Sequence, residues 1–245
     1  MFPIRDHNPS GRVPFVTYAL ILTNIGVFLA YWLTITDQNQ LGWFFYTWGL
    51  VADRTMTGGA PQTLITHMFL HGGWLHLAGN MLFLWIFGDN LEEEMGHYRF
   101  ALFYLAAGLA AAALQIAADP AADVPMVGAS GAIAGVLGGY LLLFPRARID
   151  VLFIFVIFFR IFAIPAWVVL GVWFALQLFN GAVGPADGVA YLAHVGGFIG
   201  GVVLTVPALL RRGGRAFWAR TQGHPPHPPA QYKLSKSSIP QVRKR

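Results

Sequence analysis

The chain has 245 residues, 56% of them hydrophobic and only 11% charged, whereas soluble domains carry about 25% charged residues. It contains no cysteine, which excludes disulfides, thiolate nucleophiles and cysteine-ligated metal sites. The net charge is +5, and nine of the 16 Lys and Arg residues lie in 211–245. These totals predict a multi-pass membrane protein with a basic tail near anionic lipid. They argue against nucleic-acid binding, because the basic residues are interleaved with Pro and Ser.

Hydropathy divides the chain into three parts. Residues 1–12 form a polar N-terminal segment, 13–210 a membrane domain, and 211–245 a basic, Pro-rich tail that we expect to be disordered. The predicted spans are 13–35, 66–90, 100–118, 126–144, 164–180 and 188–210. The expected fold is therefore an all-α polytopic membrane protein, a bundle of six transmembrane helices.

Two connections between spans are unusual. Residues 36–65 carry a dense aromatic patch around Trp43 and Trp48, which suits a membrane–water interface, although a folded soluble loop is an alternative. Residues 149–180 are apolar for too long to be one span, and Arg160 and Pro165 interrupt them. We favour an interfacial first part followed by one span, because a charged side chain near the surface can snorkel. The alternative is a hairpin of two short spans.

Basic residues predict the orientation. Six spans bring both termini to one side, and eight arginines flank that side: Arg5, Arg12, Arg99, Arg146, Arg148, Arg211, Arg212 and Arg215. Only Arg54 flanks the other side. The positive-inside rule therefore predicts that both termini are cytoplasmic, as expected for a protein of a bacterial plasma membrane.

Four polar side chains are expected at one depth below the outer surface. His76 and Asn80 share a face of the second span, because they are four residues apart. Ser130 lies early in the fourth span and His194 early in the sixth, and both of these spans run in the same direction as the second. Intramembrane polar residues are functional candidates. A small packing serine and a structural histidine are the alternative interpretations of each residue taken alone.

Glycines predict that the fourth and sixth spans pack closely. Gly131 and Gly135 follow Ser130 and are four residues apart, and Gly197 and Gly201 follow His194 and are also four residues apart. Small residues at this spacing allow two helix backbones to approach each other. Together with Gly128 beside the serine, they would bring Ser130 and His194 together.

The chemistry predicted for this group is nucleophilic. A serine hydroxyl becomes a nucleophile when a base takes its proton, and His194 is the candidate base for Ser130. The developing oxyanion needs fixed donors, which the Ser130 backbone N–H, the Asn80 amide and His76 can supply. We see no acidic residue placed to orient His194, so we expect a dyad without a cofactor or a metal.

The same residues resemble the rhomboid intramembrane serine proteases. Residues 128–131 match the family's G-x-S-G, 193–201 match A-H-x-x-G-x-x-x-G, and 76–80 match H-x-x-x-N. The stretch from Glu92 to Phe100 is similar to the family's junction between the second and third helices. The resemblance covers roughly residues 13–210. It implies a six-helix core that cleaves transmembrane helices of other proteins, with Ser130 as nucleophile, His194 as base, and oxyanion contacts from His76 and Asn80.

Two departures and two rival functions remain. The aromatic cluster of the first loop is not followed by the Trp-Arg pair of many bacterial relatives, and the aromatic residue that can stack on the base, one turn after the nucleophile, is replaced by Ala134. A metal site formed by His67, His71, His76 and His194 is a weaker alternative, because the spacings of the first three do not share one helical face. The other rival is a proteolytically inactive relative that binds membrane proteins. The substrate and the oligomeric state do not follow from the sequence.

Overall fold

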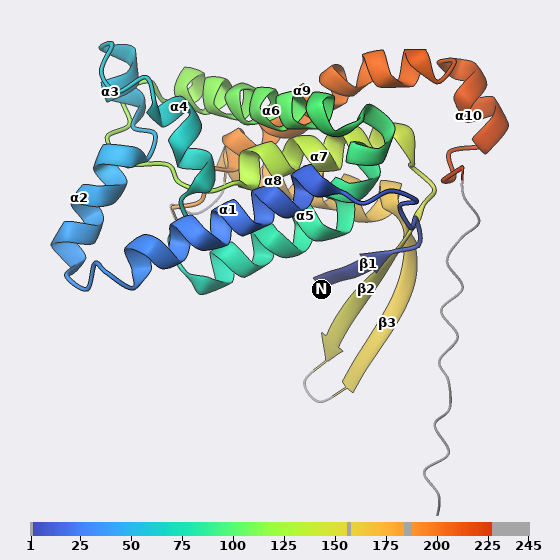
Figure 1. Cartoon of the computed structure of the whole chain (residues 1–245), viewed down its shortest axis with the longest axis horizontal. Helices are drawn as coiled ribbons and strands as arrows, with labels where there is room; N and C mark the ends of the chain where they lie inside the picture. The colour runs from blue at the N-terminus through green and yellow to red at the C-terminus, as the bar shows by residue number, and fades with distance from the viewer. Residues whose placement is uncertain (1, 156–157, 184–187, 227–245) are drawn as a thin grey trace, which may run out of the picture.

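The computed structural model describes residues 2–155, 158–183 and 188–226, and its main body is a bundle of helices (Figure 1). Six helices build this bundle: α1 (Phe15–Trp32), α5 (Trp74–Met95), α6 (His97–Ala118), α7 (Ser130–Leu143), α8 (Ala166–Val183) and α9 (Tyr191–Arg211). Short helices lie at one end of the bundle, and a small sheet with α10 (Arg215–Thr221) lies at the other. We call these the site end and the tail end.

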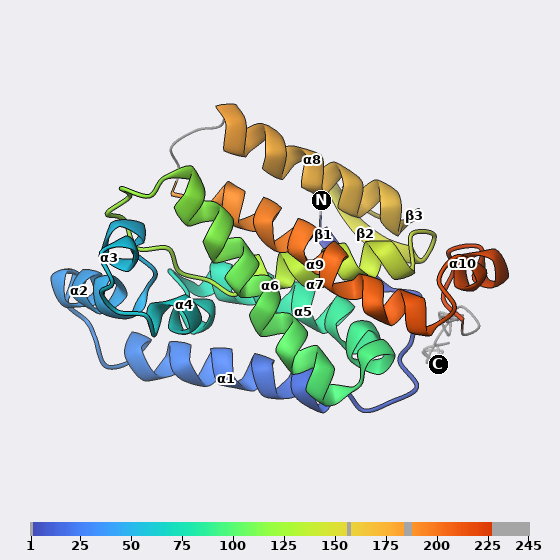
Figure 2. The ribbon, with the colours of Figure 1, turned by 90° about the horizontal axis from the view of Figure 1, so that it is seen from above.

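The helical membrane fold predicted from hydropathy is confirmed. Four helices, α1, α6, α8 and α9, are long and apolar enough to cross a membrane. α7 is apolar but has only 14 residues, and α5 ends in a polar stretch that includes Glu92. Seen from above, α1 and α8 form opposite edges of the bundle, and the other four helices lie between them (Figure 2).

α7 is the central helix of the bundle. It packs against α5, α6, α8 and α9, and 11 of its residues are buried. The predicted span began at Met126, but the helix begins only at Ser130. The preceding residues are extended, because Met126 bridges to Leu50 and the Gly128 N–H donates to the His67 carbonyl. The helix therefore starts below the end of the bundle and leaves a depression above it.

Glycines let α7 and α9 touch through their backbones, as the sequence predicts. A Cβ built on Gly197 would overlap the carbonyl of Gly131, and one on Gly201 would overlap the backbone of Gly135. α6 also packs closely against Gly131 and Gly135, since a Cβ on either glycine would overlap an alanine methyl group of that helix. No side chain larger than hydrogen fits these positions without separating the helices.

The connection 36–65 folds into short helices at the site end. These are α2 (Gln38–Trp48), α3 (Ala52–Met56) and α4 (Thr63–Thr66), followed by the 3₁₀ turn η1 (His67–Phe69). Asp37 caps α2 by accepting a hydrogen bond from the Gln40 N–H at 2.9 Å. Phe44 and Phe45 pack against Tyr31 of α1, whereas Trp43 is 69% exposed. The aromatic patch thus has one face on the bundle and one face outward.

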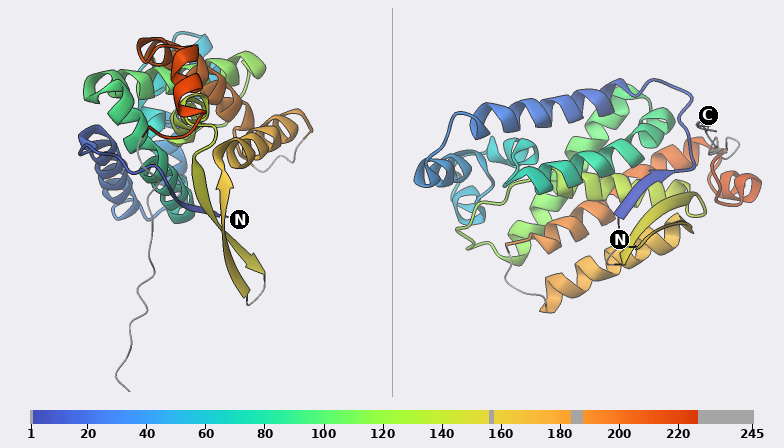
Figure 3. Two further views of the ribbon diagram at one scale, coloured as in Figure 1. Left: turned by 90° about the vertical axis from the view of Figure 1, so that its right-hand side faces the viewer. Right: turned by 90° about the horizontal axis from the view of Figure 1, so that it is seen from below.

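Residues 149–163, which the sequence placed along the membrane interface, form strands. They belong to the antiparallel hairpin β2 (Arg148–Phe155) and β3 (Phe158–Pro165), and one long helix, α8, follows instead of the alternative pair of short spans. β1 (Phe2–Asp6) adds to the other edge of β2, so the polar N-terminal segment is also partly a strand. The hairpin projects away from the helices at the tail end (Figure 3). β-branched and aromatic residues favour this extended form, and the Arg5–Asp150 ion pair at 2.6 Å fastens β1 to it.

Glu92 ties the tail ends of three helices together. Its carboxylate is 1% exposed and accepts hydrogen bonds from the Val16 and Thr17 N–H groups, at 2.8 and 2.7 Å. These N–H groups lie in the first turn of α1, where backbone N–H groups have no acceptor within their own helix. The His97 ring of α6 lies 2.5 Å from the same carboxylate.

The predicted turn at 181–187 and the predicted tail at 211–245 extend beyond the described residues, at 184–187 and 227–245.

Candidate active site

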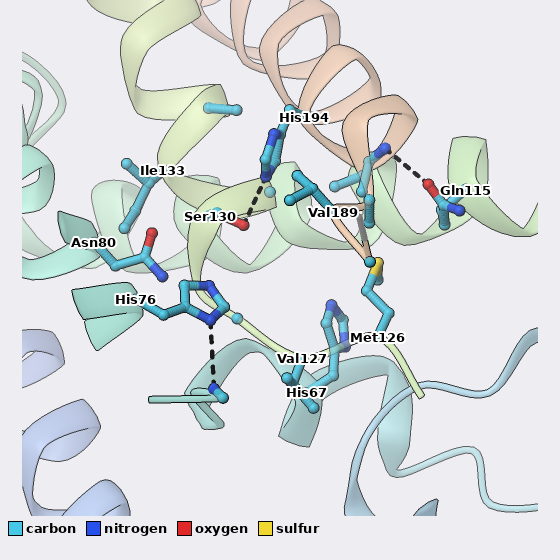
Figure 4. Close-up of a pocket in the computed structure, with 18 of the residues that line it drawn as sticks. His67, His76, Asn80, Gln115, Met126, Val127, Ser130, Ile133, Val189 and His194 are labelled. Carbon is cyan, nitrogen blue, oxygen red and sulfur yellow. Dashed lines mark hydrogen bonds between the residues drawn. The ribbon is translucent and has the colours of Figure 1, made fainter. Parts of the chain in front are cut away.

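The four predicted polar residues line one cavity at the site end of the bundle. The cavity has a volume of about 1290 Å³, and His76, Asn80, Ser130 and His194 are all in its wall. Figure 4 shows these side chains turned toward a common space between α5, α7 and α9.

Ser130 is the first residue of α7. The first N–H groups of a helix have no intrahelical acceptor, so those around Ser130 are available to a ligand. Gly128, two residues earlier, has φ +134°, a conformation that side chains rarely adopt. A Cβ at Gly128 would lie 2.7 Å from the His76 Nε2 and 3.4 Å from the Ser130 Oγ. The glycine therefore keeps open the space between the serine and His76.

His194 lies in the first turn of α9, facing α7. Its Nε2 is 2.8 Å from the Ser130 Oγ, which is hydrogen-bonding distance. The close backbone contact of Gly197 with α7, one turn further along α9, holds the histidine at this distance. The structure thus brings together the two residues that the sequence assigned as nucleophile and base.

His76 and Asn80 approach the same space from α5. The Gly72 N–H lies 3.3 Å from the His76 Nδ1, so Nδ1 is the acceptor and Nε2 carries the proton toward Gly128 and Ser130. Asn80 is 8% exposed, and its Nδ2 has no hydrogen-bond partner among the described residues. An amide donor that is buried without a partner is costly in the free protein. It is suited to receive a negative charge that develops beside it.

The four histidines of the metal alternative do not form a ligand set. Among residues 2–155, 158–183 and 188–226, no group of three His, Asp or Glu side chains converges on a point. The His67 Nδ1 lies 2.7 Å from the Thr63 carbonyl, and both ring nitrogens of His194 have protein partners. His71 packs edge-on against His76, with ring centroids 5.1 Å apart.

Sequence reasoning missed two residues of α8 that contact His194. The Gln177 Oε1 lies 2.7 Å from the His194 Nδ1, and the Trp173 ring lies 5.9 Å from the imidazole at 34°. The sequence suggested that Ala134 leaves the base without an aromatic neighbour, but Trp173 of another helix lies beside the imidazole. The sequence pattern that could have identified Trp173 and Gln177 is their spacing of four residues, which puts an aromatic and an amide side chain on one face of an apolar span.

Comparisons with known proteins agree with this architecture. A family model described as the Rhomboid domain matches residues 59–211. Rhomboid protein 1 of Saccharomyces cerevisiae mitochondria is 31% identical over 77% of this chain and 51% of its own length. RHOMBOID-like protein 4 of Arabidopsis thaliana is 31% identical over 76% of this chain and 43% of its own length.

A bacterial relative shares a shorter stretch. Rhomboid protease GluP of Bacillus subtilis is 35% identical over 52% of this chain and 24% of its own length. The chain therefore spans about half or less of the length of these curated relatives. The domain match covers more than half of the chain and includes the helices that carry His76, Asn80, Ser130 and His194. The chain is a multi-pass integral membrane protein and belongs to the rhomboid family.

Proposed function

We propose that this protein is an intramembrane serine endopeptidase that cleaves transmembrane segments of other proteins near the site end of the bundle. The observation that carries this proposal is the 2.8 Å hydrogen bond between the Ser130 Oγ and the His194 Nε2, at the wall of a cavity below the end of the bundle. A serine and a histidine at this separation are the arrangement in which a hydroxyl becomes a nucleophile. No cofactor is required.

The reaction has two halves. The Ser130 Oγ attacks the carbonyl carbon of the peptide bond while its proton moves to the His194 Nε2. The C–N bond then breaks, and the same proton leaves with the new amine. In the second half His194 takes a proton from water, the resulting hydroxide attacks the acyl ester, and the proton returns to the Ser130 Oγ as the acid is released.

The oxyanion of each tetrahedral intermediate would lie between Ser130 and α5. The Ser130 backbone N–H, the His76 Nε2–H and the unpartnered Asn80 Nδ2 are the donors that can face it. Such donors act strongly in a dry site because they need no reorganisation when the charge develops. The glycine at 128 supports this role, since any side chain there would enter the same space.

Substrate access requires an unwound peptide. A transmembrane helix hides its carbonyls in hydrogen bonds, so attack needs an extended segment. Helix-breaking residues lower the cost of unwinding, by about 1 kcal/mol for Gly relative to Ala. We therefore propose single-span substrates with a small residue before the scissile bond and helix breakers deeper in the segment. Substituting that small residue by Phe, or the helix breakers by Leu, should slow cleavage, and mass spectrometry of the products locates the cut.

We further propose a bacterial plasma membrane, with both termini in the cytoplasm. The arginines that flank the tail end support this orientation through the positive-inside rule, for example Arg12 and Arg211. A tag at either terminus should be protected from protease in intact cells, whereas a tag in the 36–65 connection should be cleaved. An exposed C-terminal tag in intact cells would contradict the orientation.

The decisive test uses the purified protein with a fluorescent phosphonate probe for serine hydrolases and with a single-span substrate. The wild-type protein should be labelled at Ser130 and should cleave the substrate. Ser130→Ala and His194→Ala should lose both activities while retaining the helical content and unfolding temperature of the wild type. A wild-type protein that binds single-span proteins without labelling or cleavage would instead support the inactive binding protein.

A further inference from the structure

Gln177 is a buried amide on α8, between two exposed leucines. It is 9% exposed, whereas its neighbours Leu176 and Leu178 are 51% and 45% exposed. Its side chain points into the bundle, where Oε1 lies 2.7 Å from the His194 Nδ1. Burial of an amide within a membrane domain is unfavourable unless its hydrogen bonds are made, so this contact needs a physical reason.

The hydrogen bond of the amide nitrogen shows which way round the Gln177 amide group lies. The Gln177 Nε2 lies 3.4 Å from the Trp173 backbone carbonyl, one turn earlier in α8. A carbonyl can only accept, so the NH₂ group belongs on that side and Oε1 faces the imidazole. Because Oε1 can only accept as well, the His194 Nδ1 must carry a proton. The lone pair of the ring then lies on Nε2, which faces the Ser130 Oγ at 2.8 Å.

We propose that Gln177 is a positioning residue that selects the Nδ1–H tautomer of His194 and thereby makes Nε2 the base for Ser130. The inference rests on the proposed function, because the tautomer matters only if His194 accepts the serine proton. In this arrangement the site has three members, Ser130, His194 and Gln177, and the third member is neutral.

A neutral third member fits the surroundings of His194. A buried carboxylate without a strong partner is expensive inside a membrane, and the sequence has no Asp or Glu between residues 151 and 186. An amide supplies the same acceptor geometry without a charge. The Trp173 ring beside the imidazole also limits its rotation, so the two α8 residues act together on the ring's orientation.

Three variants of the protein in detergent micelles test this role. In Gln177→Leu, kcat should fall about 10- to 100-fold, by analogy with the loss caused by removing a partner that orients a metal-bound histidine. KM should change little, because the amide does not face the cavity. Gln177→Glu keeps an acceptor at the same place when its carboxyl group is ionised, so kcat should recover as the pH is raised and less at acidic pH, where the buried carboxyl group is protonated. Leu176→Ala, at the adjacent lipid-facing position, should behave as wild type and controls for general disturbance of α8.

A spectroscopic measurement separates positioning from mere stabilisation. Nitrogen-15 chemical shifts of labelled histidine, with His194 assigned by its loss in His194→Gln, distinguish the Nδ1–H and Nε2–H tautomers. We expect Nδ1–H in the wild type and a mixture in Gln177→Leu. Gln115→Leu is the matched control: Gln115 accepts from the Ala193 N–H at 3.1 Å and does not touch the imidazole, so the tautomer should persist.

Each result bears on one proposal only. A wild-type protein that fails to react with the phosphonate probe contradicts the proposed function. A reactive wild type with an equally reactive, folded Gln177→Leu variant overturns the role of Gln177 and leaves the function standing. If Gln177→Leu does not fold, the wild-type spectrum still decides, since an Nε2–H tautomer of His194 would overturn the inference.

Discussion

Substitution of Gly201 by alanine tests whether backbone contact between α7 and α9 positions Ser130 against His194. The three nearest neighbours of a Cβ at Gly201 are all backbone atoms of Gly135, and the Cβ would overlap them. A backbone cannot rotate away as a side chain can, so the two helices must separate by about 1 Å to regain ordinary contact. Gly201 lies two turns from His194 on the same face of α9, and the shift is transmitted along the helix.

The magnitude follows from the distance between the reacting atoms. A separation of about 1 Å would lengthen the Ser130 Oγ to His194 Nε2 distance from 2.8 Å to about 3.8 Å, beyond hydrogen bonding. Misplacement on this scale costs about 100-fold in rate. Overpacking should also destabilise the fold by about 1–3 kcal/mol. Gly197→Ala should act in the same way, because its Cβ would overlap the carbonyl of Gly131.

The assay compares these variants with glycines that have room. Nothing lies within 4 Å of a Cβ built on Gly26 of α1 or Gly171 of α8, so Gly26→Ala and Gly171→Ala are matched controls. Alanine is a better helix former than glycine, and the controls should unfold at or above the wild-type temperature. Probe labelling rates and thermal unfolding are measured on the same preparations. A Gly201→Ala protein with wild-type labelling and stability would show that α7 and α9 are not in the contact described here.

Three further outcomes are expected. Asn80→Ala should lower kcat by about 10- to 1000-fold with little change in unfolding temperature, because it removes one of the proposed oxyanion donors. Unchanged turnover per folded molecule would reassign Asn80 to helix packing. Burial raises the pKa of Asp6 in β1 from 3.8 to about 7, so the folded state favours the protonated acid, which Tyr140 contacts at 2.7 Å. The free energy of unfolding gained from the protonated acid is complete below pH 3.8 and is lost as the pH rises through 7. Asp6→Asn should therefore unfold at a higher temperature than the wild type at pH 8 and at a similar temperature near pH 4. Equal unfolding curves at pH 8 would contradict the burial of Asp6. Phe159 of β3 is 65% exposed near the tip of the hairpin, so a fluorophore on Phe159→Cys, the only thiol in the chain, should be quenched by spin-labelled lipid. A fluorophore on Gln40→Cys of α2 should be quenched less, and equal quenching would show that the hairpin does not contact lipid.

The sequence by itself determined the helical membrane fold, the order of the spans and the candidate site. These features depend on patterns within single segments. Hydropathy over about 20 residues marks a span, a spacing of four residues puts His76 and Asn80 on one face, and glycines at the same spacing mark a close helix contact. Ser130 and His194 could be paired because both lie early in spans that run in the same direction.

Tertiary structure decided the features that depend on distant partners. The hydropathy of residues 149–163 suggests an interfacial segment but does not predict that they form a hairpin. β1 extends this hairpin through strand pairing and the ion pair between Arg5 and Asp150, which are 145 residues apart in sequence. α7 begins at Ser130 because the bridge to Leu50 and the hydrogen bond to His67 hold the preceding residues extended. Gln177 reaches His194 only because α8 packs beside α9 in the bundle. Pairing across such separations is set by packing, which local periodicity does not encode.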